Sequence, residues 1–105
     1  MTVIVPHNLA PEEALARIRG MLARLRARHA DKISHVREEW SADGGRFALT
    51  VMGMPVQGRI VVQAGQARVD GQLPFAAMFF QGRIEQAIRE AAAEALAAPA
   101  SETSA

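Results

Sequence analysis

Apolar and polar residues alternate along the stretch from Arg46 to Pro74. A period of two is typical of strands that bury one face and expose the other. Turn residues at Gly53-Met54-Pro55 and Ala64-Gly65-Gln66 divide the stretch into three runs, and such short connections make neighbouring strands antiparallel. The stretch therefore predicts a β-meander whose apolar face is formed by Phe47, Leu49, Val51, Val56, Gly58, Ile60, Val62, Ala67, Val69, Gly71 and Leu73.

Two further strands are predicted before the meander. The run from Thr2 to His7 is β-branched and contains Pro6, which favours the edge of a sheet. In the run from Ile33 to Trp40, Glu38 falls on the same face as the apolar residues around it. We interpret Glu38 as an inward-leaning charge that protects a sheet edge from pairing with another chain. A carboxylate in a cleft is the alternative interpretation.

The chain also contains two segments with helical periodicity. Pro11-Glu12-Glu13 suits the first turn of a helix, whose apolar stripe recurs every three to four residues and which should end near His29 to Asp31. After Pro74 the period again becomes helical. The two apolar stripes are Leu15, Ile18, Leu22 and Leu25, and Phe80, Ile84, Ala87, Ile88, Ala91 and Ala95.

These elements predict a two-layer α+β fold of order βαββββα. An antiparallel meander sheet is covered on one face by two helices, an arrangement similar to the helix-grip fold. We expect a single domain over residues 1–97 and a disordered tail over 98–105. The outer sheet face, which includes Ala48 and Val61, is expected to be solvated or to pair with a second copy in a homodimer.

Composition narrows the classes of function. Half of the 105 residues are apolar, 22% are charged and the net charge is +1, so no strong field attracts nucleic acid. The five arginines of the first helix are spread around it, which favours a solvated face over a nucleic-acid site. Without cysteine the chain forms neither disulfides nor thiolate sites. No stretch has the length of a membrane span or the pattern of a signal peptide, which predicts a cytoplasmic protein.

The sequence carries no recognisable catalytic constellation. His7, His29 and His35 lie on different predicted elements, without the spacing of metal ligands. Ser34 and His35 are adjacent in a predicted strand and should face opposite ways, which would separate a nucleophile from its base. We therefore expect no enzymatic activity, no metal and no cofactor.

An aromatic cluster follows Leu73-Pro74. It comprises Phe75, Met78, Phe79 and Phe80, at a junction between strand and helix where a single helix face does not accommodate all four. Exposed, these residues would form a hydrophobic contact surface for a granule, a lipid or a protein. Alternatively, they close one end of the core or form a dimer contact.

Scattered residues resemble the polyhydroxyalkanoic acid system family over about Val3 to Leu96. The resemblance is carried by His7-Asn8-Leu9 before Pro11-Glu12-Glu13-Ala14, Trp40 before Asp43-Gly44, Gly58, Leu73-Pro74, and Arg83-Ile84-Glu85 with Ile88. It implies a bacterial protein associated with polyhydroxyalkanoate storage granules, and it implies no reaction or cofactor.

The resemblance and the aromatic cluster together predict a non-enzymatic accessory protein. It would contact the granule surface or granule proteins through Phe75, Met78, Phe79 and Phe80, and it would be cytoplasmic or granule-associated. The alternative is a carrier of a small hydrophobic ligand, such as an acyl chain or a lipid, which would be held between the sheet and the C-terminal helix. That alternative is suggested by a similarity, at the level of fold alone, to START-type lipid-binding proteins.

Overall fold

The computed structural model describes residues 1–97, so the tail predicted over 98–105 lies outside the described residues. Five strands, three α-helices and a short 3-10 helix account for most of these residues. In chain order they are β1 (Thr2–Pro6), α1 (Pro11–Ile18), α2 (Met21–Arg28), β2 (Ile33–Trp40), β3 (Gly44–Val51), β4 (Met54–Gln63), β5 (Gln66–Gln72), η1 (Phe75–Phe80) and α3 (Gln81–Ala97).

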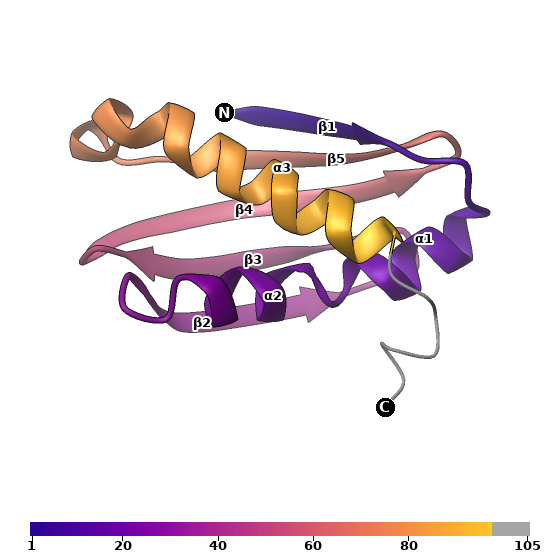
Figure 1. Cartoon of the computed structure of the whole chain (residues 1–105), viewed down its shortest axis with the longest axis horizontal. Coiled ribbons are helices and arrows are strands. Elements are labelled where there is room, and N and C mark those ends of the chain that lie inside the picture. Colours follow the sequence, from indigo (N-terminus) through magenta and orange to yellow (C-terminus); the bar gives the residue numbers. More distant parts are fainter. Residues whose placement is uncertain (98–105) are drawn as a thin grey trace.

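The five strands form one antiparallel sheet in the order β1-β5-β4-β3-β2. The helices lie together over one face of this sheet, as Figure 1 shows. The predicted two-layer α+β architecture is confirmed, and so is the order βαββββα. The first strand of the chain and β2 occupy the two edges, where the sequence placed them.

The period of two determines which side chains enter the core. Phe47 pairs with Gly58 across β3 and β4, and Leu49 pairs with Val56. Paired residues share a face, and Phe47, Leu49 and Val56 are all buried beneath the helices. The same alternation buries Ile60, Val62, Ala67 and Val69 along β4 and β5.

The predicted first helix is interrupted at Arg19 and Gly20, which separate α1 from α2. The Gly20 amide donates a hydrogen bond to the Arg17 carbonyl over 3.1 Å, and this i, i+3 bond tightens the last turn of α1. Glycine favours such a break because it stabilises a helix less than other residues do. The apolar stripe nevertheless continues through the break, and α2 ends at Arg28, as predicted.

Helix α3 crosses the sheet diagonally (Figure 1). Its C-terminal half packs closely, because Ala91, Ala92 and Ala95 are fully buried and their small side chains let the helix approach its neighbours. Two arginines join this half to the other helices. Arg17 donates a hydrogen bond to the Leu96 carbonyl over 2.8 Å, and Arg28 forms ion pairs with Glu90 and Glu94.

The edge strand β2 contains a bulge that the sequence did not predict. The pairing register with β3 shifts between Ser34 and Arg37, and His35 has a φ of 54°. The expectation that Ser34 and His35 face opposite ways is therefore wrong, because the bulge interrupts the alternation. Ser34 Oγ and His35 Nδ1 lie 3.0 Å apart, and both residues are exposed.

Glu38 lies on the edge strand β2, after the bulge, and pairs in register with Phe47 of β3. Its side chain is exposed, and its Oε1 accepts a hydrogen bond from Trp40 Nε1 over 3.1 Å. Glu38 is absent from the lining of the apolar groove described below. This position fits a charge that guards a sheet edge, which stays our interpretation of its role.

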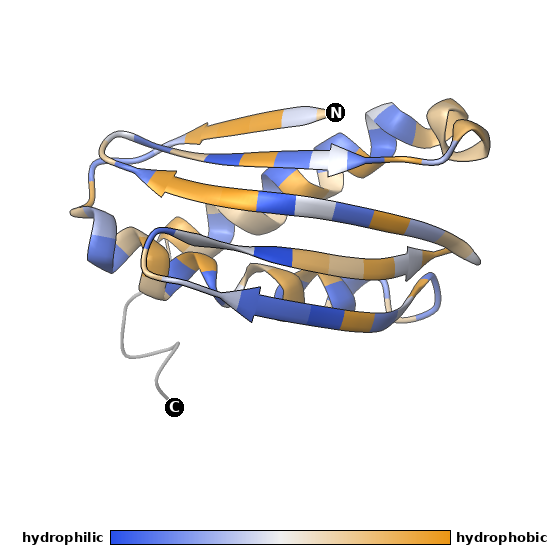
Figure 2. Cartoon of the chain, turned by 180° about the vertical axis from the view of Figure 1, so that it is seen from behind, coloured by the Kyte–Doolittle hydropathy of each residue, from blue (hydrophilic) through white to orange (hydrophobic). Residues whose placement is uncertain are grey.

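The outer sheet face carries no helix (Figure 2), and its strands alternate between hydrophilic and hydrophobic residues. A row of polar residues crosses this face, because register places Glu39 beside Arg46, Arg46 beside Arg59, and Arg59 beside Asp70. Val61 is half-buried on the same face. Pairing of this face with a second copy stays a prediction.

Candidate functional site

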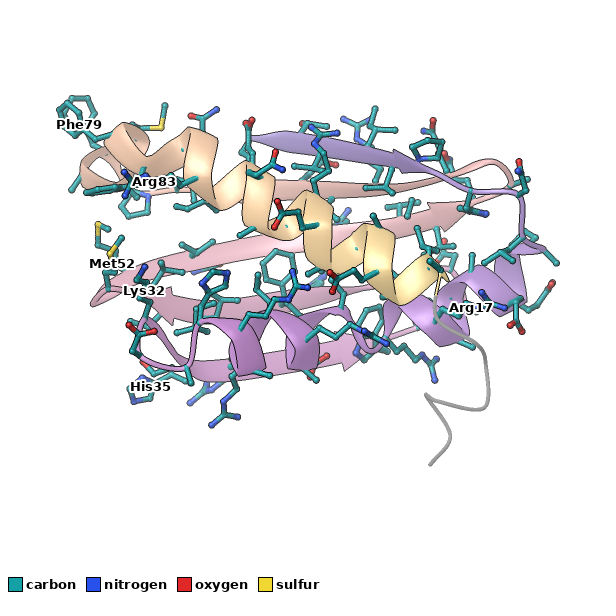
Figure 3. All side chains as sticks on the ribbon, in the orientation of Figure 1. Arg17, Lys32, His35, Met52, Phe79 and Arg83 are labelled. Atoms are coloured by element: carbon teal, nitrogen blue, oxygen red, sulfur yellow. The ribbon has the colours of Figure 1, made fainter. Side chains whose placement is uncertain are left out.

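The residues of the predicted contact surface lie at one end of the molecule, on η1. Phe75 is 87% exposed and Phe79 is 85% exposed, whereas Met78 and Phe80 are 52% and 37% exposed. We call these four residues the phenylalanine patch. Figure 3 shows Phe79 projecting from this end, away from the sheet. Within one chain, then, the patch is not enclosed in the core.

The local sequence explains why these side chains point outward. Pro74 is extended, and its carbonyl accepts a hydrogen bond from the Ala77 amide over 2.9 Å, which begins the 3-10 turn. Ala77 is the buried residue of η1 and has no exposed surface. A 3-10 turn has three residues per turn, so burying Ala77 turns Phe75 and Phe79 away from the protein.

Beside the patch, an apolar groove opens between α2, α3 and the sheet. It encloses about 180 Å³. Most of its lining consists of aliphatic and aromatic side chains from both layers of the fold. These are Met21, Leu22, Leu25, Ile33, Phe47, Leu49, Val51, Met52, Val56, Phe80, Ile84, Ala87 and Ile88.

The diagonal path of α3 explains the groove. The C-terminal half of α3 meets α1 and α2 through Leu96, Glu90 and Glu94, as described above. Its first turns diverge from α2 (Figure 1). The apolar floor that two parallel helices would have covered is left partly open there, between Leu25 on α2 and Ile84 on α3.

The polar residues of the groove lining are all basic or imidazole side chains: His29, Lys32 and Arg83. In Figure 3, Arg83, Met52 and Lys32 lie at the same end of the molecule as Phe79. Neither Lys32 nor Arg83 forms an ion pair or a side-chain hydrogen bond with any residue of the described range 1–97. The groove lining therefore presents two cations that lack an acidic partner in this part of the chain.

Met52 lies at the tip of the hairpin between β3 and β4, at the mouth of the groove. Both turn residues have positive φ, 50° for Met52 and 80° for Gly53. Two-residue turns of this kind favour Asn-Gly, because the Cβ atom of an L-residue is strained at positive φ and asparagine offsets this strain by local hydrogen bonding. Met52 is also 46% exposed. An apolar residue in a strained, exposed position is typical of a functional surface.

Sequence reasoning found the patch but missed the basic residues of the groove. His29, Lys32 and Arg83 come from the end of α2, the loop before β2, and α3, so the tertiary fold decides that all three line one groove. One signal was present in the sequence. Arg83 lies three residues after Phe80 and beside Ile84, which places it at the border of the apolar helix face.

The histidines do not converge. His7 Nδ1 accepts a hydrogen bond from the Leu9 amide over 3.0 Å, so its Nε2 carries the proton and donates to the Gln63 carbonyl over 2.8 Å. His7 thus fixes the connection between β1 and α1 to the hairpin that follows β4. Residues 1–97 contain no group of three histidine or carboxylate side chains arranged to hold a metal ion.

The sequence profile of the family described as "Putative polyhydroxyalkanoic acid system protein" matches residues 1–96. The chain belongs to this family. No curated protein and no solved structure matches it.

The match to the polyhydroxyalkanoic acid system family spans every element of the fold, from β1 to α3. It therefore includes both the phenylalanine patch and the groove. Among residues 1–97, no helix of this family member is both long enough and apolar enough to cross a bilayer.

Proposed function

We propose that this member of the polyhydroxyalkanoic acid system family is a non-enzymatic accessory protein. It contacts granule polymer or granule proteins through Phe75, Met78, Phe79 and Phe80, in the cytoplasm at the granule surface. The observation that carries the proposal is the exposure of Phe75 and Phe79, at 87% and 85%. These two side chains bury little apolar area in their own core. Contact with an apolar partner would bury that area and would be favoured by the hydrophobic effect.

The chemistry of the patch suits such a partner. The six residues of η1 include no charged or hydrogen-bonding side chain. A polyester presents mainly methylene groups, methyl groups and ester carbonyls, so contact with it does not require charged partners. Met78 adds an unbranched, adaptable side chain that conforms to an irregular surface.

A non-enzymatic role is supported by the groove next to the patch. Its lining contains no hydroxyl, thiol or carboxylate side chain, so His29, a candidate general base, has no such nucleophile beside it to activate. The exposed pair Ser34 and His35 lies outside that lining.

Partitioning of a tagged protein between granules and cytosol tests the proposal. Phe75→Ser with Phe79→Ser should move the protein into the cytosol, because these two side chains provide most of the exposed apolar area of the patch. Ile4→Ser is the matched control, since Ile4 is an apolar residue 43% exposed on a different element. The proposal is wrong if the folded double variant partitions like the wild type.

Purified polymer particles distinguish the two partners. Binding of the wild type to protein-free particles, lost in the double variant, assigns the patch to polymer. Binding only to native granules that retain their proteins assigns it to a granule protein.

A second candidate function, carriage of a small hydrophobic ligand, is favoured by the groove of about 180 Å³ between α2, α3 and the sheet. Ligand pockets in proteins are usually apolar clefts with few polar groups, as this groove is. Native mass spectrometry tests it. A retained acyl ligand supports carriage, whereas protein that stays empty after incubation with acyl compounds contradicts it.

A further inference from the structure

We propose that the groove binds a free carboxylic acid with a medium-length acyl chain. The chain lies between α2 and α3, and the carboxylate is held by Lys32 and Arg83. This inference rests on the carrier function proposed above and names its ligand class.

The size of the groove sets the length of the chain. An apolar cavity of ~150 Å³ holds a benzene ring. A groove of about 180 Å³ therefore accommodates roughly six to eight carbon atoms. The walls that would contact them are aliphatic and aromatic, with Leu25, Leu49, Ile84 and Ile88 among them. Each buried methylene group favours transfer from water, so the affinity should rise with chain length until the groove is filled.

The charge of the lining sets the head group. Lys32 and Arg83 both line the groove, and neither has an ion-pair partner among residues 1–97. A carboxylate matches this pair, because arginine binds carboxylates through two parallel hydrogen bonds and lysine adds a point charge. Both residues are exposed, so the head group would sit at the mouth of the groove and the chain would extend inward.

The placement of acidic residues strengthens this assignment. Glu90 and Glu94 are the carboxylates of α3 that face α2, and they pair with Arg28. Glu85 accepts a hydrogen bond from Gln81 over 3.0 Å. None of these three carboxylates lines the groove, so none competes there with the acid for Lys32 or Arg83.

Titration with octanoate, monitored by amide chemical shifts in NMR spectra, tests the inference. Octanoate should shift the amides of Ile84 and Ile88 and those around Lys32. Octanol, which has the same chain and no charge, should bind more weakly. Butyrate should also bind more weakly than octanoate, because it buries fewer methylene groups. All ligands are kept below the concentration at which octanoate forms micelles.

Charge variants locate the carboxylate. Lys32→Gln and Arg83→Gln should each weaken octanoate binding about tenfold, the effect of losing one charge-assisted hydrogen bond, and should leave octanol binding unchanged. Arg26→Gln is the matched control, because Arg26 is an exposed arginine of α2 that lies outside the groove lining. Its octanoate affinity should equal that of the wild type.

The outcomes separate this inference from the functions proposed above. If octanol binds as tightly as octanoate, or if Lys32→Gln with Arg83→Gln retains full octanoate affinity, the carboxylic acid assignment is overturned and carriage stands. If neither ligand binds, carriage fails as well. The double variant at Phe75 and Phe79 should still bind octanoate, because neither phenylalanine lines the groove. Loss of octanoate binding in that variant would overturn the placement of the acid in the groove.

Discussion

The ring of Phe47 lies directly over Gly58 on the neighbouring strand. The two residues are paired in register across β3 and β4, and a Cβ atom at Gly58 would lie 2.3 Å from Phe47 Cζ and 2.6 Å from the Asp70 carbonyl oxygen. Only glycine leaves room for the ring at this point. Phe47 also lines the groove, so the absence of a side chain at Gly58 helps to set the shape of the groove floor.

Gly58→Ala is therefore expected to destabilise the protein by about 1–3 kcal/mol, because the new methyl group must displace a ring and a backbone carbonyl. Urea unfolding measures the change. Gly82→Ala is the control, since nothing lies within 4 Å of a Cβ atom at Gly82, near the start of α3. That variant should gain about 0.5–1 kcal/mol from helix propensity. Equal effects of the two substitutions would contradict the close contact between Phe47 and Gly58.

Met52→Asn is expected to stabilise the hairpin by about 0.5–1 kcal/mol. Asparagine tolerates positive φ better than methionine, and Asn-Gly is the favoured pair for such a turn. Thermal unfolding measures the gain. Met78→Asn, at an exposed methionine without positive φ, should give no comparable increase. An unchanged melting temperature for Met52→Asn would show that the turn is not strained.

Asp70 is expected to make stability depend on pH. The Thr2 hydroxyl donates a hydrogen bond to Asp70 Oδ1 over 2.7 Å, and this bond, with the nearby Arg68 guanidinium, holds the pKa of the Asp70 carboxyl below its usual value. A lowered pKa in the folded state stabilises the protein above the unfolded pKa of about 3.9. This contribution is lost as the pH falls through the folded pKa.

Asp70→Asn should thus destabilise the protein at pH 7, and the difference from the wild type should shrink as the pH is lowered from 5 to about 2. Urea midpoints across this range measure it. Asp31→Asn is the control, because Asp31 is exposed. A difference between wild type and Asp70→Asn that stays constant with pH would contradict the role of the carboxylate.

Arg17→Gln is expected to cost about 1–2 kcal/mol and to loosen the end of α3. Arg17 donates to Glu13 Oε1 over 2.9 Å and to the Leu96 carbonyl over 2.8 Å, and its side chain is only 18% exposed. Amide hydrogen exchange should accelerate in the last turn of α3. Arg26→Gln should stay within about 0.5 kcal/mol of the wild type. Unchanged exchange in Arg17→Gln would show that the alanine packing alone holds this end.

The elements that the sequence predicted well are those set by local periodicity. Alternation placed Leu49 and Val56 on the buried face. A strand has only two faces, and a shift of one residue in register would move its apolar side chains from the core to solvent. Pro6 in β1 predicted an edge strand for a different local reason, because proline has no amide hydrogen to donate to a neighbouring strand. The cluster after Pro74 was recognised from composition, and the exposure of Phe75 and Phe79 then followed from the 3-10 turn around Ala77.

The features that the sequence did not predict depend on how distant segments meet. The break at Gly20 was missed because the apolar stripe continues through it, and the bulge at His35 was missed because it depends on pairing with β3. The carrier alternative placed an acyl chain between the sheet and the C-terminal helix, but the shape of the groove arises from the angle of α3, which the sequence did not predict. Periodicity predicts the buried face of a helix and not its crossing angle. It therefore did not predict that Lys32 and Arg83 line the same groove.

The bulge in β2 has a consequence for crowding. If copies gather on a granule surface, as proposed, they would meet edge to edge, and an uninterrupted strand at the border of each sheet would let neighbours join into a growing fibre. The bulge at His35 breaks the straight row of backbone amide and carbonyl groups at that border, and the exposed Glu38 lies on the same strand. Copies gathered in this way would therefore be expected to lie side by side without joining into one continuous sheet.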